Sequence, residues 1–440
     1  MGQMASLPLS SSSNPKRDFV YDALLQDNHI RLLRLAPAKE HHAPLSGSLM
    51  HADLKTDPEY DALSYVWGDP AQVGTITVDG KPLPISQNLR TALRYVRQRD
   101  RPYILWTDAI CINQADEDEK YRQVRLMRQI YAKATCVRAW IDHKMDRPAP
   151  ALKMLAGLEG NPSRMMDYGE RYWYPAANLF KNKYWSRLWV QQEVMLAQKF
   201  IIQCQDDIFD GQPFLSFARI VLERSADHTL PPNNTFKALY DYMSATNRGW
   251  EFVARNQLFF QKQRLQPAAV VKKQTQGCLL DLFMSSRYLQ VSDQRDRVFG
   301  LLGISNDGDS YSRRFDGREY STSVTVVYIN AINSFVNVHW RLSFLCLKGW
   351  TEVDKDAHAY LNRMPSWLPT PFQPSHFRQF AYLDLAGGGE INNVGWSVSS
   401  SEPGLHCSGV MVGRVQVLGS HGNLAASPIE DWYAEMRRLH

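Results

Sequence analysis

Short apolar segments alternate with helix-forming segments between residues 60 and 204, and this alternation constrains the fold more than any other feature of the chain. The apolar segments lie at 60–68, 103–114, 136–141 and 199–204. The helix-forming segments lie at 88–98, 115–134 and 184–196, and residues 75–86 alternate like a β-hairpin. Strands that alternate with helices favour a parallel sheet with helices on both faces. The sequence therefore predicts an α/β fold.

The length of 440 residues exceeds what one simple core accommodates, so we expect several regions. Residues 1–18 are rich in Ser and lack periodicity, which predicts a disordered tail. The α/β pattern occupies a domain at 19–225. Residues 226–345 favour a mainly helical region. Residues 346–440 are rich in Pro, Gly and Ser and favour a small β-rich unit with a terminal helix.

The composition is that of an ordinary soluble globular protein. The net charge of +5 is small for this length, and basic residues are interleaved with acidic ones. Because nucleic-acid binding usually needs a concentrated basic patch, no nucleic-acid partner is expected. The chain also has no GxGxxG or GxxxxGK[ST] motif, which argues against a dehydrogenase or a P-loop NTPase.

The six cysteines are isolated from one another, and no CxxC or HExxH motif occurs. Neither a metal site nor a disulfide framework is expected, and isolated cysteines suit the reducing cytoplasm. No apolar run reaches the about 18–20 residues that a membrane span needs. Gly2 and Ser6 fit the acceptor pattern for N-myristoylation. The pattern predicts either weak membrane contact through one acyl chain or a chance match within a Ser-rich tail.

Candidate site residues follow the predicted strands, because ligands of open α/β sheets bind outside the carboxyl ends of the strands. Trp67 could wall a nucleotide pocket, while Gly68 suits the turn before Asp69. Asp108 is either a site residue or a cap for the following turn. The next candidates, Asn113 and Gln114, contact a ligand or cap the acidic helix. Cys111 lies between two isoleucines, which is typical of a small core residue.

Residues 184–196, YWSRLWVQQEVML, lack Gly and Pro and favour a helix. On one helix, Trp185, Trp189 and Glu193 would share a face because they are four positions apart. A carboxylate at the end of an aromatic stripe is unusual, because burial disfavours ionised groups. Glu193 is therefore either paired structurally, for example with Arg187, or catalytic. Trp189 is either a core residue or part of a pocket wall.

Several of these segments, in this order and spacing, resemble the heterokaryon-incompatibility (HET) domain of filamentous fungi. They are YDALSYVWGDP, NLRTALRYVR, ILWTDAICINQADEDEKYRQVRLMRQIYAKA and WSRLWVQQE. The resemblance covers residues 19–205 closely and 277–370 more loosely. It implies a role in non-self recognition and regulated cell death, and a fold similar to the flavodoxin-like Toll/interleukin-1 receptor (TIR) domain.

The resemblance to TIR domains also implies roles for particular residues. WVQQE places Glu193 four residues after Trp189, as in the TIR motif whose glutamate is needed for NAD cleavage. Ser186 lies three positions before the tryptophan, where the TIR pattern has its serine two before, so a ribose-contacting role does not carry over to it. The resemblance implies self-association and a non-self recognition partner protein.

A single carboxylate suffices for cleavage of the ribosyl–nicotinamide bond. Nicotinamide leaves as a neutral molecule, so no general acid is required. A carboxylate near the ribose stabilises the oxocarbenium-like transition state, as in glycoside hydrolysis. We therefore expect NAD or a related nucleotide as substrate, Glu193 as catalytic residue, and no resident cofactor. The alternatives are a non-enzymatic module for signalling and self-association, and hydrolysis of another nucleotide or a nucleic acid.

Overall fold

The computed structural model describes residues 19–24, 26–69, 71–142, parts of 151–168, 169–227, 234–264, 277–312, 320, 322–339, 396–398 and 405–407. The chain divides into two compact units, Met1–Glu390 and Ile391–His440. In the second unit, strands β10 (Trp396–Val398) and β11 (Leu405–Cys407) pair antiparallel. The predicted tail at 1–18, including Gly2, and the predicted terminal helix lie outside the described residues. The predicted boundaries at 225 and 345 stay predictions.

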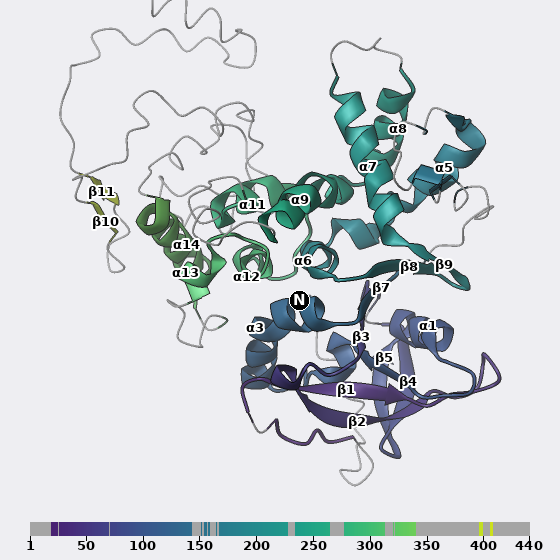
Figure 1. Ribbon diagram of the computed structural model, residues 1–440. Coiled ribbons are helices and arrows are strands. Elements are labelled where there is room, and N and C mark those ends of the chain that lie inside the picture. The colour runs from purple at the N-terminus through teal and green to yellow at the C-terminus, as the bar shows by residue number, and fades with distance from the viewer. Residues whose placement is uncertain are drawn as a thin grey trace, which may run out of the picture. The chain divides into compact units, whose positions relative to one another are not determined.

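The described residues of the first unit form a nine-stranded sheet (Figure 1). Its strands run in the spatial order β5-β4-β2-β1-β6-β3-β7-β8-β9. The strands are β1 (His29–Leu35), β2 (Ser46–Asp53), β3 (Asp61–Tyr65), β4 (Val73–Val78), β5 (Lys81–Ser86), β6 (Tyr103–Trp106), β7 (Cys136–Trp140), β8 (Phe200–Cys204) and β9 (Asp207–Asp210).

The sheet is mixed, with a parallel centre. The inner strands β6, β3, β7 and β8 pair parallel, whereas β1 pairs antiparallel with both β2 and β6. The hairpins β4–β5 and β8–β9 end the sheet on either side. The α/β fold class is confirmed, and the parallel sheet that the sequence predicts corresponds to the four inner strands.

The chain order of the inner strands creates a topological switch point. The chain runs from β3 outward to β6 and then crosses back over β3 to reach β7, so the spatial order of these four strands is the flavodoxin-like 2-1-3-4. Right-handed crossovers then place the connecting helices on opposite faces. Helices α1 (Gln87–Val96) and α3 (Glu117–Lys133) accordingly lie on either side of β3 and β7 (Figure 1). A ligand crevice is expected between the carboxyl ends of β3 and β7.

Local sequence explains where these two helices begin. The Ser86 hydroxyl accepts a hydrogen bond from the backbone N–H of Leu89, and the Asp116 carboxylate accepts one from that of Glu119 at 2.9 Å. Such caps satisfy backbone donors that have no partner inside the helix. Both helices follow the predicted spacing of apolar residues. Between β6 and α3, however, the predicted strand at 103–114 ends at Trp106, and a short helix α2 (Asp108–Cys111) follows.

The predicted helix at 184–196 is divided by Arg187. A 3₁₀ turn, η3 (Lys183–Ser186), precedes Arg187, and helix α6 (Leu188–Leu196) follows it. Arg187 is extended, with φ −78° and ψ 134°. The backbone on both sides of it pairs with Gln290, since Gln290 N donates to Ser186 O at 2.6 Å and Leu188 N donates to Gln290 O at 3.1 Å. These long-range hydrogen bonds override the local helix propensity. The single stripe from Trp185 to Glu193 was therefore a wrong prediction.

Helix α6 is buried along its whole length rather than amphipathic. On one side it contacts β3, and on another it contacts α12 (Asp296–Leu302). Gly300 of α12 and Gly303, which caps its carboxyl end, lie close to α6. An added Cβ would lie 2.2 Å from Leu188 Cδ2 at Gly300 and 2.6 Å from Gln192 Oε1 at Gly303. The absence of these side chains allows the two helices to pack directly on each other.

The predicted helical region after residue 225 is confirmed within the described ranges. Its helices are α8 (Thr235–Ser244), α9 (Gly249–Arg264), α11 (Leu279–Ser285), α12, α13 (Gly308–Ser312) and α14 (Val324–His339). Helix α7 (Gly211–Ser225) precedes them and contacts α8 and α9. None of the helices described here is both long and apolar enough to cross a membrane.

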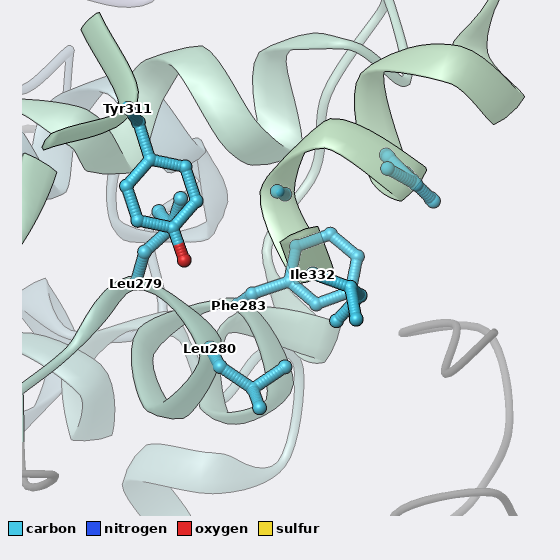
Figure 2. Close-up of a pocket in the computed structure, with 7 residues that line it drawn as sticks. Leu279, Leu280, Phe283, Tyr311 and Ile332 are labelled. Carbon is cyan, nitrogen blue, oxygen red and sulfur yellow. The ribbon is translucent and has the colours of Figure 1, made fainter. Parts of the chain in front are cut away.

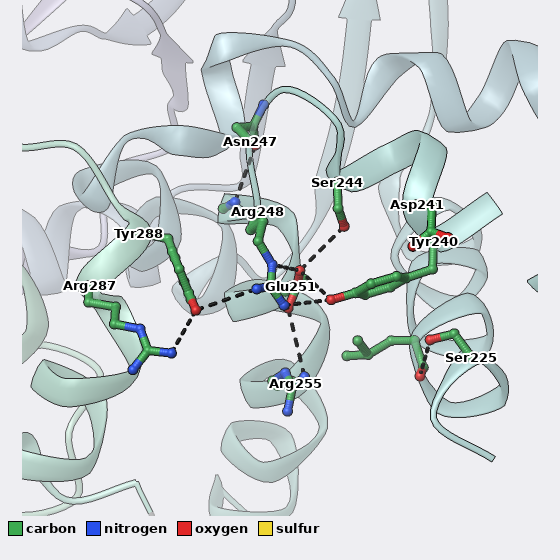
Figure 3. A network of polar contacts seen from close by, with 12 residues as sticks. Ser225, Tyr240, Asp241, Ser244, Asn247, Arg248, Glu251, Arg255, Arg287 and Tyr288 are labelled. Carbon is green, nitrogen blue, oxygen red and sulfur yellow. Dashed lines mark hydrogen bonds and ion pairs between the residues drawn. The ribbon is translucent and has the colours of Figure 1, made fainter. Parts of the chain in front are cut away.

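A buried glutamate connects α8 and α9 to the turn η4 (Ser286–Tyr288). Arg248 donates to both carboxylate oxygens of Glu251, and its Nη2 donates to the Tyr240 hydroxyl (Figure 3). The Arg248 guanidinium also lies 4.8 Å from the ring centroid of Tyr288. The buried carboxylate is thus compensated by a cation and by hydrogen bonds, so the network is structural.

A candidate functional site

The carboxyl ends of β3 and β7 border a cleft of about 570 Å³. This is within the about 300–1,000 Å³ usual for small-molecule sites. Its walls come from the loop after β3, the first turns of α1, the exit of β7, and the loop between α5 (Glu170–Leu179) and η3. The cleft therefore occupies the switch point that the strand order predicts.

Three residues join the elements at the cleft floor. Asn88 of α1 donates from Nδ2 to the carbonyl of Val66 at 2.5 Å, and its Oδ1 accepts from Trp140 Nε1 at 3.0 Å. One amide thus holds the ends of β3 and β7 against α1. The chain leaves β3 through Gly68, whose φ of +83° is the left-handed conformation that glycine tolerates best. The predicted role of Gly68 in a turn stays a prediction.

The cleft carries charges of both signs. Asp69 and Asp142 follow β3 and β7 and are exposed. Lys181 lies on the α5–η3 loop, and Lys183 is the first residue of η3. The Lys181 Nζ is 4.1 Å from the ring centroid of Tyr242. Carboxylates therefore line the strand-end wall, and ammonium groups line the loop wall.

Glu193 lies beneath the β3 strand end rather than in the cleft wall. Its side chain is 4% exposed, and its Oε2 accepts a hydrogen bond from the Ser64 hydroxyl. The Ser64 hydroxyl also lies 2.7 Å from that of Tyr184. Both partners adjoin the cleft along the chain, since Ser64 precedes Val66 by two residues and Tyr184 follows Lys183.

Burial raises the pKa of Glu193 to about 7, although the Arg187 guanidinium and the hydrogen bond from Ser64 act in the opposite direction. Asp108 raises the pKa of Glu193 further because it is a second carboxylate nearby. Arg187 itself donates to the carbonyl of Tyr65. Near neutral pH, Glu193 therefore exists in both protonated and ionised forms, an attribute that is common among residues of functional sites.

Two other candidates, Trp67 and Asp108, contact each other. The Trp67 indole donates from Nε1 to Asp108 Oδ2 at 2.7 Å, and Ala109 N donates to Asp108 Oδ1 at 2.7 Å. Burial raises the pKa of Asp108, and Arg187 opposes this effect. Gln114 donates from Nε2 to the carbonyl of Asp108 at 2.9 Å. These three residues form one group next to the cleft but do not line it.

Asn113 and Trp189 lie in other surroundings. The Asn113 side chain accepts from the backbone N–H of Ala115 at 3.2 Å, just before α3. Trp189 is 4% exposed and donates from Nε1 to Asp296 Oδ2 of α12 at 3.2 Å. Of the predicted site residues, only Gly68 and Asp69 line the cleft. The functional roles of all of them stay predictions.

Sequence reasoning missed most of the cleft. Asp142 could have been found, because it follows a predicted strand at the same sheet edge as Asp69. Lys181 and Lys183 lie on a loop after a helix that the sequence did not predict, and no local signal marks them. Within the described residues there is no group of three side chains suited to bind a metal ion. Cys111 is buried, as expected for a core residue, and burial raises its pKa to about 12.

A second cavity lies among α11, α13 and α14 (Figure 2). It is lined by apolar and aromatic side chains, including Leu279, Phe283 and Tyr311. Its volume is about 10 Å³, which is near the minimum for one water molecule. It is a packing void, so the switch-point cleft is the better candidate.

Comparison with known proteins agrees with the sequence motifs. Residues 60–193 match the family model described as Heterokaryon incompatibility protein (HET). These residues form a HET domain. The chain is also 26% identical to Heterokaryon incompatibility protein 6, OR allele, of Neurospora crassa, over 96% of this chain and 71% of that protein. No solved structure matches the chain. The HET match begins just before β3 and ends at Glu193 inside α6, so α12, which packs on α6, lies outside it.

Proposed function

We propose that this protein acts in fungal non-self recognition and that its HET domain promotes regulated cell death. The proposal is supported by the HET match at 60–193 and by the similarity to a heterokaryon incompatibility protein over nearly the whole chain. Its biochemical activity, in this proposal, is cleavage of NAD or a related nucleotide at the nicotinamide–ribose bond.

One observation carries the proposed activity: a cleft of nucleotide size lies at the switch point, with a buried carboxylate of raised pKa beneath its edge. In the reaction, the bond between ribose C1′ and the nicotinamide nitrogen breaks, and nicotinamide leaves as a neutral molecule. Ionised Glu193 stabilises the positive charge that develops on the ribose. Water then adds to C1′ and releases a proton, which gives ADP-ribose.

The catalytic step requires Glu193 to reach the ribose. In the structure its carboxylate is hydrogen-bonded to Ser64 on β3. Exchange of this hydrogen bond for one to a ribose hydroxyl would keep the buried carboxylate satisfied. Movement of the β3 exit, between Ser64 and Gly68, would open the path from the cleft to Glu193.

The second candidate function is a non-enzymatic module for signalling and self-association. It is favoured by the burial of α6 on all sides and by the compensation of Glu193 by Ser64. A carboxylate in this setting also fits a purely structural role.

Nicotinamide release separates these functions. The purified full chain is incubated with NAD, both dilute and at high concentration with a crowding agent, and nicotinamide is quantified by chromatography. We expect release that is lost in Glu193→Gln and retained in Glu223→Gln, a matched change at an exposed residue of α7. Release that survives Glu193→Gln would exclude the glutamate mechanism. Cell death without nicotinamide release in any state would favour the signalling module.

A further inference from the structure

The cleft has a charge arrangement that selects among ligands. Its two acidic side chains, Asp69 and Asp142, follow adjacent strands. Its two basic side chains, Lys181 and Lys183, lie two positions apart where the α5–η3 loop enters η3. A polyanion such as nucleic acid would meet repulsion from the exposed carboxylates. A small ligand with an anionic end and an uncharged, hydroxyl-rich end matches both walls.

The lysine-bearing loop is held by residues outside the HET match. Asn247 donates from Nδ2 to the carbonyls of Lys181 at 3.1 Å and Asn182 at 3.2 Å. The Thr246 hydroxyl donates to the carbonyl of Lys181 at 3.1 Å. Asn182 in turn accepts from the backbone N–H of Tyr184 at 2.9 Å, which caps η3. Because the loop is fixed at several carbonyls, its backbone requires little ordering when an anion binds.

The remaining polar groups suit a nucleotide. Lysine ammonium groups bind phosphate as point charges, and carboxylates accept hydrogen bonds from ribose hydroxyls. Side-chain amides can both donate to and accept from a base. Five side-chain amides line the cleft: Gln72, Gln87, Asn88, Asn178 and Asn182. Asn88 and Asn182 hold neighbouring elements, so a base would contact Gln72, Gln87 or Asn178.

We propose that the cleft binds the nucleoside diphosphate part of its ligand in one orientation. The phosphates lie at Lys181 and Lys183, and a ribose lies at Asp69 and Asp142. The inference rests on the proposed function for the identity of the nucleotide, NAD or a relative, but the binding itself requires no catalysis. Lys181 and Lys183 are then binding residues, although neither belongs to the motif YDALSYVWGDP or to WVQQE.

The test is calorimetric titration of the full chain with ADP-ribose. Lys181→Gln and Lys183→Gln together remove both charges and keep polar side chains of similar length. We expect the Kd to rise by at least about tenfold, since each lysine contributes a charge-assisted hydrogen bond. We also expect the Kd of the unchanged protein to rise with salt concentration more steeply than that of the double variant. Lys199→Gln is the matched control, because Lys199 is exposed at the amino end of β8, the opposite end of the strands from the cleft.

A second pair of variants tests the orientation. Asp69→Asn with Asp142→Asn should weaken ADP-ribose binding while leaving inorganic pyrophosphate binding unchanged or stronger. Unchanged ADP-ribose affinity in the double lysine variant would overturn the proposal, as would equal losses for ADP-ribose and pyrophosphate in the aspartate variant. The absence of detectable binding at millimolar ADP-ribose would also overturn the proposal.

The outcomes also separate this inference from the proposed activity. Nicotinamide release with an unchanged KM in the double lysine variant would refute the binding mode and leave the activity standing. Lysine-dependent binding of ADP-ribose without nicotinamide release would support the binding mode and refute the activity.

Discussion

Because α12 packs directly on α6, a single added methyl group at their contact should lower the stability of the protein. In Gly300→Ala, the new Cβ would lie 2.2 Å from Leu188 Cδ2 and 3.6 Å from Trp189 Cδ2. Contacts of Cβ below 3.0 Å are essentially never seen, so either the fully buried Leu188 changes rotamer or the helices separate. Overpacking of this kind costs about 1–3 kcal/mol. Without the contact, alanine would instead stabilise a helix by about 0.5–1 kcal/mol relative to glycine.

The assay is urea unfolding followed by tryptophan fluorescence, with thermal unfolding in parallel. At about 2–4 °C per kcal/mol, the expected fall in Tm is about 2–12 °C. Gly169→Ala is the control, because an added Cβ there meets nothing within 4 Å. Combining Gly300→Ala with Leu188→Ala should cost less than the sum of the two single changes, because the smaller side chain makes room for the methyl group. Equal stabilities of Gly300→Ala and Gly169→Ala would refute the direct packing of α12 on α6.

Three further changes test the buried polar groups. Between about pH 4.5 and 7 the folded chain holds a proton on Glu193 that the unfolded chain releases, so this residue contributes stability at low pH that is lost as the pH rises. As the pH rises through that window, the free energy of unfolding of Glu193→Gln should therefore increase relative to that of the parent protein by about 1.4 kcal/mol per pH unit. The measurement compares the unfolding free energies of the two proteins at pH 5 and at pH 7. Arg31 forms a buried ion pair with Glu119 at 2.6 Å. Arg31→Met leaves the Glu119 charge buried without its partner and should lower the unfolding free energy, measured in urea, by about 3–5 kcal/mol. Adding Glu119→Leu removes that charge and should recover part of the loss. Trp189→Phe removes the hydrogen bond to the fully buried Asp296 and should cost about 1–3 kcal/mol, whereas an unchanged urea midpoint would exclude a stabilising role for that bond.

The inner strands and their helices were predictable because their apolar periodicity is local. α1, for example, buries Leu89, Leu93 and Val96 at helical spacing, and β7 is a short apolar run. The segments that sequence reasoning missed lack this signal. Strand β2, SGSLMHAD, has no fully buried residue, and α5 contains Pro175 within an aromatic sequence. Their structure depends on partners elsewhere in the chain.

The site was predictable only where it follows the strands. The switch-point rule places Asp69 at a ligand crevice, since the rule needs only strand order. Lys181 and Lys183 reach the same cleft because Asn247, more than 60 residues further on, holds their loop. Long-range hydrogen bonds of this kind leave no pattern in a single sequence.

Trp189 and Glu193 show that sequence spacing predicts the position of a residue on a helix but not the partner that its side chain contacts. The two residues do lie one turn apart on α6, as the sequence predicts, yet they contact different parts of the protein. The Trp189 indole reaches Asp296 of α12, whereas the Glu193 carboxylate reaches Ser64 of β3. Helix α6 therefore links the contact with α12 to the contact with β3. The HET match ends at Glu193, but the packing that holds this residue in place continues into α12.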